Sequence, residues 1–167
     1  MDGWPIPLGQ TLATYLAFTA IIIGRYFLIV APIHYMLWKR PENKVKARRL
    51  SKREPTARII RHEIRLSVIS AFIYALPAAI VIEMWKAGGT ALYSGAIIGV
   101  SGYAYLLISC FLFLAVQDTY FYWTHRLMHR KKFYNWSHAG HHKSVQPTPW
   151  ASFSFDPIEA AISAWLL

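Results

Sequence analysis

"AIIGVSGYAYLLISCFLFLAVQ", residues 96–117, contains no charged side chain. An α-helix needs about 20 apolar residues to cross a bilayer, so this stretch predicts a transmembrane helix. Two upstream segments, within residues 11–38 and 66–85, have the same apolar character. The chain is 55% hydrophobic yet carries a net charge of +10, a combination typical of membrane proteins with basic loops. We predict an all-α integral membrane protein, with one membrane-embedded domain over residues 1–167 and about three transmembrane helices.

The cations predict the orientation. Residues 39–65 hold eleven lysines and arginines and residues 126–143 hold five, whereas the first ten residues hold none. Because cytoplasmic loops are enriched in Lys and Arg, both basic segments are expected in the cytosol, and the third span leads back to that side. The predicted location is a multi-pass membrane protein of the endoplasmic reticulum if eukaryotic, or of the inner membrane if bacterial. With membrane spans present, nucleic acid is not expected as a partner.

Some polar residues in or near these segments have simple interpretations. The run 44–65 predicts a helix lying on an anionic leaflet. Arg25 interrupts the first segment; snorkelling, or a tilted and broken segment, is preferred over a functional charge. His34 and His62 are expected to face the interface or headgroups rather than a metal.

Five of the seven histidines lie in "HRLMHRKKFYNWSHAGHHK", residues 125–143. His125 and His129 have the i, i+4 spacing that places two side chains on one helical face. His141 and His142 lie three and four positions after His138 and diverge from each other by about 100° on a helix. One ion could not easily take both, so the doubled histidine suggests a dinuclear site.

This spacing predicts two facing helices with inward imidazoles. "RKKFYNWS" would form the turn between them, and Ser137 would cap a helix over "HAGHH". Imidazole suits iron and zinc among other metals. The nearby cations should point away from the metal: Arg126, Arg130, Lys131 and Lys132.

Other functions explain the cluster less well. A zinc protease helix needs H-E-x-x-H, but Arg126 occupies the glutamate position. A Ser/His/Asp hydrolase would leave four histidines without a role. A non-enzymatic basic membrane protein that binds anionic lipid stays open as an alternative, as does a zinc-binding membrane protein of another type.

Residues 118–160, "DTYFYWTHRLMHRKKFYNWSHAGHHKSVQPTPWASFSFDPIEA", resemble the fatty acid hydroxylase / sterol desaturase superfamily of membrane di-iron oxygenases. The resemblance rests on D-x-x-x-Y-W-x-H-R-x-x-H, on H-x-x-H-H and on P-T-P-W-A-S-F. It implies an O2-dependent, non-haem oxidoreductase that hydroxylates or desaturates a sterol or fatty acyl chain. It also implies two iron ions, with zinc as a possible substitute, and an electron carrier of the cytochrome b5 or ferredoxin type.

The resemblance also implies the site residues. The metal ligands would be the five clustered histidines, His125, His129, His138, His141 and His142. Asp118, two turns before His125, could orient a ligand imidazole or simply end the third span. Asp156 stands where many relatives are expected to have histidine, so its role stays open. The sequence assigns no catalytic residue and does not specify the lipid, the bond attacked, the redox partner or the oligomeric state.

Five histidines are few for two ions. The resembling family has a further H-x-x-H-H cluster downstream of another membrane hairpin, whereas this sequence ends in "IEAAISAWLL", an apolar stretch of ten residues. We therefore expect the 167 residues to be an N-terminal fragment that alone holds metal poorly and turns over no lipid. A stop codon directly after Leu167 would contradict this expectation.

Overall fold

The computed structural model describes residues 7–39, 54–92 and 99–165. Helices account for nearly all of this part of the chain, and no strand occurs in it, which confirms the all-α prediction. In chain order the elements are α1 (Leu8–His34), η1 (Tyr35–Lys39), α3 (Ala57–Lys86), α4 (Gly99–Met128), α5 (Lys131–Ser137), η2 (His141–Lys143), η3 (Pro149–Phe153) and α6 (Pro157–Ala164).

Three helices are long and apolar enough to cross a membrane: Leu8–Trp38, Ala57–Lys86 and Gly99–Met128. Their number confirms the prediction of about three transmembrane helices, and the chain is a membrane protein. Helices α3 and α4 extend beyond the predicted segments, α3 back to Ala57 and α4 on to Met128, because no glycine or proline separates the apolar stretch from that basic or polar flank.

The start of α3 differs from the sequence-based expectation. Residues 57–65 were expected to belong to a helix on the membrane surface, but they form the first turns of the continuous helix α3. The Thr56 side chain caps this helix by accepting a hydrogen bond from the Ile59 N–H at 3.3 Å. Residues 44–53 of the predicted surface helix lie outside the described residues.

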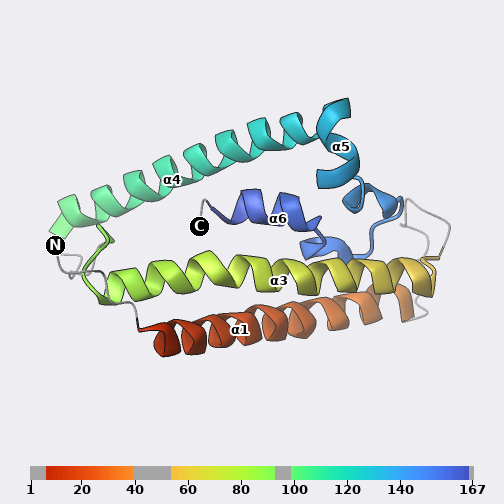
Figure 1. Ribbon diagram of the computed structural model, residues 1–167, viewed down its shortest axis with the longest axis horizontal. Coiled ribbons are helices and arrows are strands. Elements are labelled where there is room, and N and C mark those ends of the chain that lie inside the picture. The colour runs from red at the N-terminus through yellow and green to blue at the C-terminus, as the bar shows by residue number, and fades with distance from the viewer. Residues whose placement is uncertain (1–6, 40–53, 93–98, 166–167) are drawn as a thin grey trace.

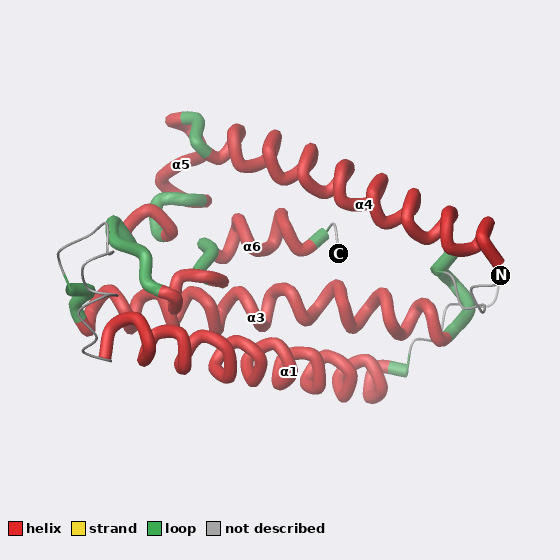
Figure 2. Tube along the Cα trace, turned by 180° about the vertical axis from the view of Figure 1, so that it is seen from behind, coloured by secondary structure: helices red, strands yellow, loops and turns green. Residues whose placement is uncertain are grey.

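Helices α1 and α3 lie side by side along their length (Figures 1 and 2). A row of buried alanines on α3, Ala71, Ala75 and Ala79, lets neighbouring elements approach closely. Near the opposite end from the histidines, Thr14 Oγ1 donates to Glu83 Oε1 at 2.5 Å, and Lys86 Nζ lies 2.7 Å from the same oxygen. The only carboxylate in the apolar part of α3 is thus paired.

Helix α4 stands apart from this pair, with α6 between α4 and α3 (Figures 1 and 2). Within the described residues it contacts chiefly α5 and α6. Its apolar side chains are open to the surroundings; Leu107 is 70% and Phe111 71% exposed. In a bilayer this helix therefore presents its apolar surface to hydrocarbon or to other protein.

The short elements form a cap that Trp150 of η3 fixes to the long helices. Tyr26 Oη and Ser67 Oγ donate to the Trp150 carbonyl at 2.7 and 3.0 Å. The indole also lies 5.6 Å from the ring of His34, which stacks on Trp38 at the same centroid distance. His34 therefore packs among aromatic rings near the end of α1.

Candidate metal centre

His125 lies in the last turn of α4, and His129 follows directly after the helix, with its N–H donating to the His125 carbonyl at 3.1 Å. Their i, i+4 spacing places both rings on one face of the helix, and their Nε2 atoms lie 3.2 Å apart. Two nitrogens with lone pairs this close would repel each other unless they share a proton or an ion. The expected pairing of these two histidines is thus present in the structure.

His138 follows the end of α5 and adds a third imidazole. Its ring centroid lies 4.5 Å from that of His125 and 4.7 Å from that of His129. One ligand nitrogen from each of the three residues falls within 4.8 Å of the others. His138 is fully buried, and its Nε2 has no hydrogen-bond partner in the described part of the chain. A buried orphan nitrogen facing two other imidazoles fits a metal ion.

His141 and His142 in η2 complete the cluster. The ring centroid of His142 lies 5.0 Å from His129 and 4.6 Å from His138, and that of His141 lies 5.3 Å from His138. The Nδ1–H of His141 donates to the Ser154 carbonyl at 2.7 Å, which leaves its Nε2 as the lone-pair nitrogen. The structure therefore brings all five predicted histidines together.

The backbone around the second motif is not the predicted one. "RKKFYNWS", expected as a turn, contains the helix α5, and "HAGHH", expected as a helix, is a turn followed by a short 3-10 helix. Ser137 does not cap a new helix, because its Oγ donates to the Phe133 carbonyl one turn back at 2.8 Å. His138 leaves the helical region with φ −148°.

Contacts from distant elements hold this turn. Asp156 Oδ2 accepts a hydrogen bond from the His141 backbone N–H at 3.0 Å. The Nε2–H of His62 in α3 donates to the Gly140 carbonyl, also at 3.0 Å. The His141 N–H and the Gly140 carbonyl, which would pair within an α-helix, are thus hydrogen-bonded to side chains of other elements. His62, expected at the interface or among headgroups rather than on a metal, supports the turn that carries His141.

Glu159 is the carboxylate behind the cluster, and the sequence analysis missed it. It is fully buried in α6, its Oε2 accepts from His138 Nδ1 at 2.8 Å, and its Oε1 lies 3.5 Å from His125 Nδ1. Asp118, considered for this role, is exposed on α4 and makes no hydrogen bond to a histidine in the described residues. The available signal was an isolated carboxylate in the apolar "PIEAAISA" stretch.

Glu63 of α3 was also missed, because it lies in the basic run "RIIRHEIR". It is fully buried and accepts hydrogen bonds from the Thr148 N–H at 3.2 Å and from the hydroxyls of Thr148 and Ser144. This carboxylate ties the loop after η2 to α3. The same loop connects η2, which carries His141 and His142, with η3, which carries Trp150.

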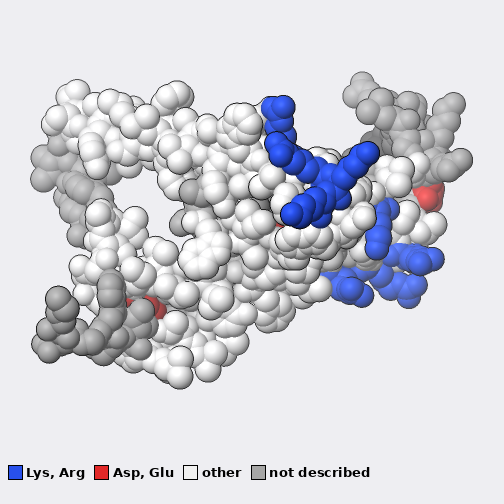
Figure 3. Space-filling model, turned by 45° about the horizontal axis from the view of Figure 1, so that its top comes forward, with Lys and Arg blue, Asp and Glu red and all other residues white. Residues whose placement is uncertain are grey.

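The surroundings of His138 and His142 favour the neutral imidazole, which is the form that binds metals. Burial lowers the pKa of His138 to about 4, and repulsion from His142 and His129 adds to the effect. Burial, followed by His141, lowers the pKa of His142. Burial raises the pKa of Glu159. Four cations of the motif region are exposed: Arg126, Arg130, Lys131 and Lys132. They were expected to point away from the metal, but Lys131 lines a pocket together with His129 and His142. Figure 3 shows Lys and Arg side chains gathered towards one end of the molecule.

Comparison with known proteins agrees with this site. A family model described as "Fatty acid hydroxylase" matches residues 110–167. Two Delta(7)-sterol 5(6)-desaturases of Gibberella zeae are each 30% identical to the chain, one over 112 residues (64% of this chain, 34% of the relative) and one over 166 residues (95% and 44%). A lathosterol oxidase of Rattus norvegicus is 29% identical over 105 residues (63% and 35%).

The chain spans less than half the length of these curated relatives. No solved structure matches it. The matched family region contains all five histidines together with Asp156 and Glu159, which is the part of the molecule that the structure brings into one cluster. The chain therefore belongs to the fatty acid hydroxylase / sterol desaturase superfamily.

Proposed function

We propose that the protein is a membrane lipid oxidoreductase that hydroxylates or desaturates a sterol or fatty acyl chain, with two iron ions and O2. The observation that carries this proposal is the convergence of His125, His129 and His138 on one point, with Glu159 behind them. The names of the relatives, sterol desaturase and lathosterol oxidase, support a lipid as the substrate.

Each residue of the cluster has a distinct part in this proposal. His125, His129 and His138 would hold one ion, and His141 and His142 would contribute to the second. Iron bound there would supply O2-dependent oxidation of an unactivated C–H bond. Glu159 accepts the Nδ1–H of His138 and the Ser154 carbonyl accepts that of His141. Such partners fix the tautomer, so that Nε2 keeps its lone pair for a metal.

The surroundings of the cluster support a cytosolic electron donor. A pocket beside α5 is lined by His129, His142 and Lys131, so two of the histidines are reachable from outside the bundle. The exposed Lys131 lines this opening, and Arg130 and Lys132, its exposed neighbours in sequence, add positive charge to the same segment. An acidic carrier of the cytochrome b5 or ferredoxin type would be steered towards these cations. Because cations are enriched on the cytoplasmic side, we place this end of the molecule in the cytosol.

Metal analysis of the purified full-length protein tests the proposal. We expect bound iron in the wild type and its loss in His129→Ala, because that substitution removes one of the three converging nitrogens. His34→Ala is the matched control, since His34 packs on Trp38 and Trp150; it should keep the iron. Incubation with lipid extract, O2 and a reducing system, read by mass spectrometry, then identifies the product.

Three outcomes would contradict the proposal. A wild-type protein without metal would leave the histidines without their proposed role. Equal iron in His129→Ala and the wild type would place the metal elsewhere. Zinc bound tightly even after growth in iron-rich, zinc-poor medium, with no mass shift in any lipid, would favour a zinc-binding membrane protein.

A further inference from the structure

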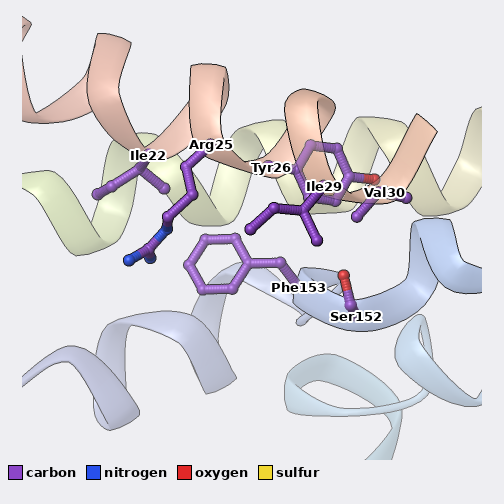
Figure 4. Close-up of a pocket in the computed structure, with 7 residues that line it drawn as sticks. All are labelled: Ile22, Arg25, Tyr26, Ile29, Val30, Ser152 and Phe153. Atoms are coloured by element: carbon purple, nitrogen blue, oxygen red, sulfur yellow. The ribbon is translucent and has the colours of Figure 1, made fainter. Parts of the chain in front are cut away.

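A hollow lies between α1 and η3 (Figure 4), and its lining residues include no histidine. Ile22, Ile29 and Val30 line it from α1, and Ser152 and Phe153 line it from η3. Its volume is about 160 Å³, whereas one water takes up roughly 30 Å³. The hollow can therefore hold a polar group of several heavy atoms, but it is too small for a sterol nucleus.

Arg25 is the charged residue of this hollow. Figure 4 shows its side chain extending from α1 towards η3, on the same side of the hollow as the Phe153 ring. Ser152 lies at the opposite end of the hollow. Arg25 is exposed and forms no hydrogen bond or ion pair within residues 7–39, 54–92 and 99–165. Ionisable residues in membrane-spanning helices are costly unless they meet a partner, and they commonly mark functional sites.

The depth of Arg25 follows from its neighbour α3. Tyr26 and Ser67 donate to the same Trp150 carbonyl, so residue 26 of α1 and residue 67 of α3 lie at the same height. The cations Arg58, Arg61 and Arg65 precede Leu66. Residues 66–85 carry one charged side chain, the paired Glu83. They are about 30 Å long at 1.5 Å per residue, which matches the hydrocarbon thickness.

Arg25 therefore lies at the edge of the hydrocarbon layer on the histidine side, where lipid phosphates begin. A guanidinium binds phosphate through two parallel hydrogen bonds. The apolar walls from Ile22, Ile29 and Phe153 suit the glycerol end of the acyl chains. Snorkelling, the interpretation preferred from the sequence, is not needed at this height.

We propose that the hollow between α1 and η3 binds the phosphate group of a phospholipid from the leaflet on the histidine side, with Arg25 as its cation. The site is separate from the metal centre and does not depend on the proposed function. It would hold a structural or regulatory lipid beside η3, the element that fixes the cap to α1 and α3 through Trp150.

Native mass spectrometry of the purified chain in neutral detergent, titrated with phosphatidylglycerol, tests the proposal. The wild type should bind one lipid, and Arg25→Gln should weaken this binding by about tenfold or more, the loss expected for a charge-assisted contact. Arg25→Lys should fall between them, because lysine keeps the charge without the planar fork. Arg61→Gln is the matched control: it removes an exposed arginine of α3 outside the hollow and should change the affinity little.

Thermal unfolding of each variant accompanies the titration. Among the described residues Arg25 has no polar partner to lose, so its variants should unfold near the wild-type temperature. If Arg25→Gln does not fold, Arg25→Lys provides the test. Unchanged affinity in the folded Arg25 variants, or an equal loss in Arg61→Gln, would overturn the proposal. Equal competition by oleate would also overturn it, because the ligand of Arg25 would then be a carboxylate. A bound second chain that Arg25→Gln releases would overturn it too, because Arg25 would then make a protein contact.

Discussion

Gly140 offers a sharp test of how the second histidine motif is held. Its φ of −66° and ψ of −42° suit any residue, so the reason for glycine is not the backbone conformation. A Cβ at this position would overlap Asp156 Oδ1 and lie 2.9 Å from Asp156 Cγ. Asp156 cannot retreat freely, because its Oδ2 accepts the His141 N–H at 3.0 Å and its carbonyl accepts the Ala160 N–H at 2.8 Å.

The magnitude follows from these two contacts. Overpacking costs about 1–3 kcal/mol, and a hydrogen bond to a charged group contributes about 1.5–3 kcal/mol. Asp156 is only partly buried, so we take the lower half of each range. Gly140→Ala should then cost about 1–2 kcal/mol and Asp156→Ala about 1.5–2 kcal/mol of unfolding free energy. The double variant should cost about as much as Asp156→Ala alone, because without the carboxylate the alanine has nothing to overlap.

Equilibrium unfolding in detergent micelles measures the four free energies of this double-mutant cycle. Gly24→Ala in α1 is the matched control; nothing lies within 4 Å of its added Cβ, and alanine favours a helix by up to about 1 kcal/mol. A double variant that costs the sum of its two single variants would show that Gly140 and Asp156 do not act on each other. A Gly140→Ala chain as stable as Gly24→Ala would also refute the reasoning.

Three other predictions concern the same end of the molecule. Glu159→Ala should lower metal affinity by about 10- to 100-fold in equilibrium dialysis, with a smaller loss in Glu159→Gln, which keeps an acceptor for His138; equal losses would contradict a role through the hydrogen bond. The folded pKa of His138, about 4, lies below its usual 6.5, so the folded metal-free protein binds fewer protons than the unfolded one between these values. The contribution of His138 to stability should be lost as the pH falls from about 6.5 towards 4. The unfolding free energy of the wild type and of His138→Gln, measured at several pH values, isolates this contribution. The same pH dependence in both proteins would contradict it. Lys131→Glu should slow association with an acidic electron carrier in stopped-flow experiments at low salt, whereas Lys86→Glu at the other end of the molecule should not; the same rate in all three proteins would exclude steering by this face.

The membrane helices and the histidine cluster could be predicted because each depends on local spacing. A bilayer requires about 20 apolar residues in a row, and residues 96–117 meet that requirement without reference to the rest of the chain. The i, i+4 spacing of His125 and His129 likewise acts within one helix. The helix ends were less predictable, since α3 continues from its apolar part back to Ala57 through a basic run.

The backbone of "HAGHH" could not be predicted because its partners are remote in sequence. The periodicity of His138, His141 and His142 suits a helix, but His62 and Asp156 bind the polar groups of this turn from 78 and 15 residues away. Local spacing contains no information about such partners. The same holds for Glu63, which resembles a solvated residue among arginines until its contacts with Thr148 and Ser144 are seen.

Asp156 is a further residue whose role is clear only from its contacts in the folded chain. The sequence marks it only as a departure from the histidine expected in many relatives, whereas its position gives it a physical role. Its carboxylate holds the His141 N–H and fills the space beside Gly140. Glycine at 140 and aspartate at 156 therefore depend on each other: a larger residue at 140 would displace the carboxylate. A relative with a different residue at 156 must satisfy the His141 N–H in another way, and is then free of this particular constraint on position 140.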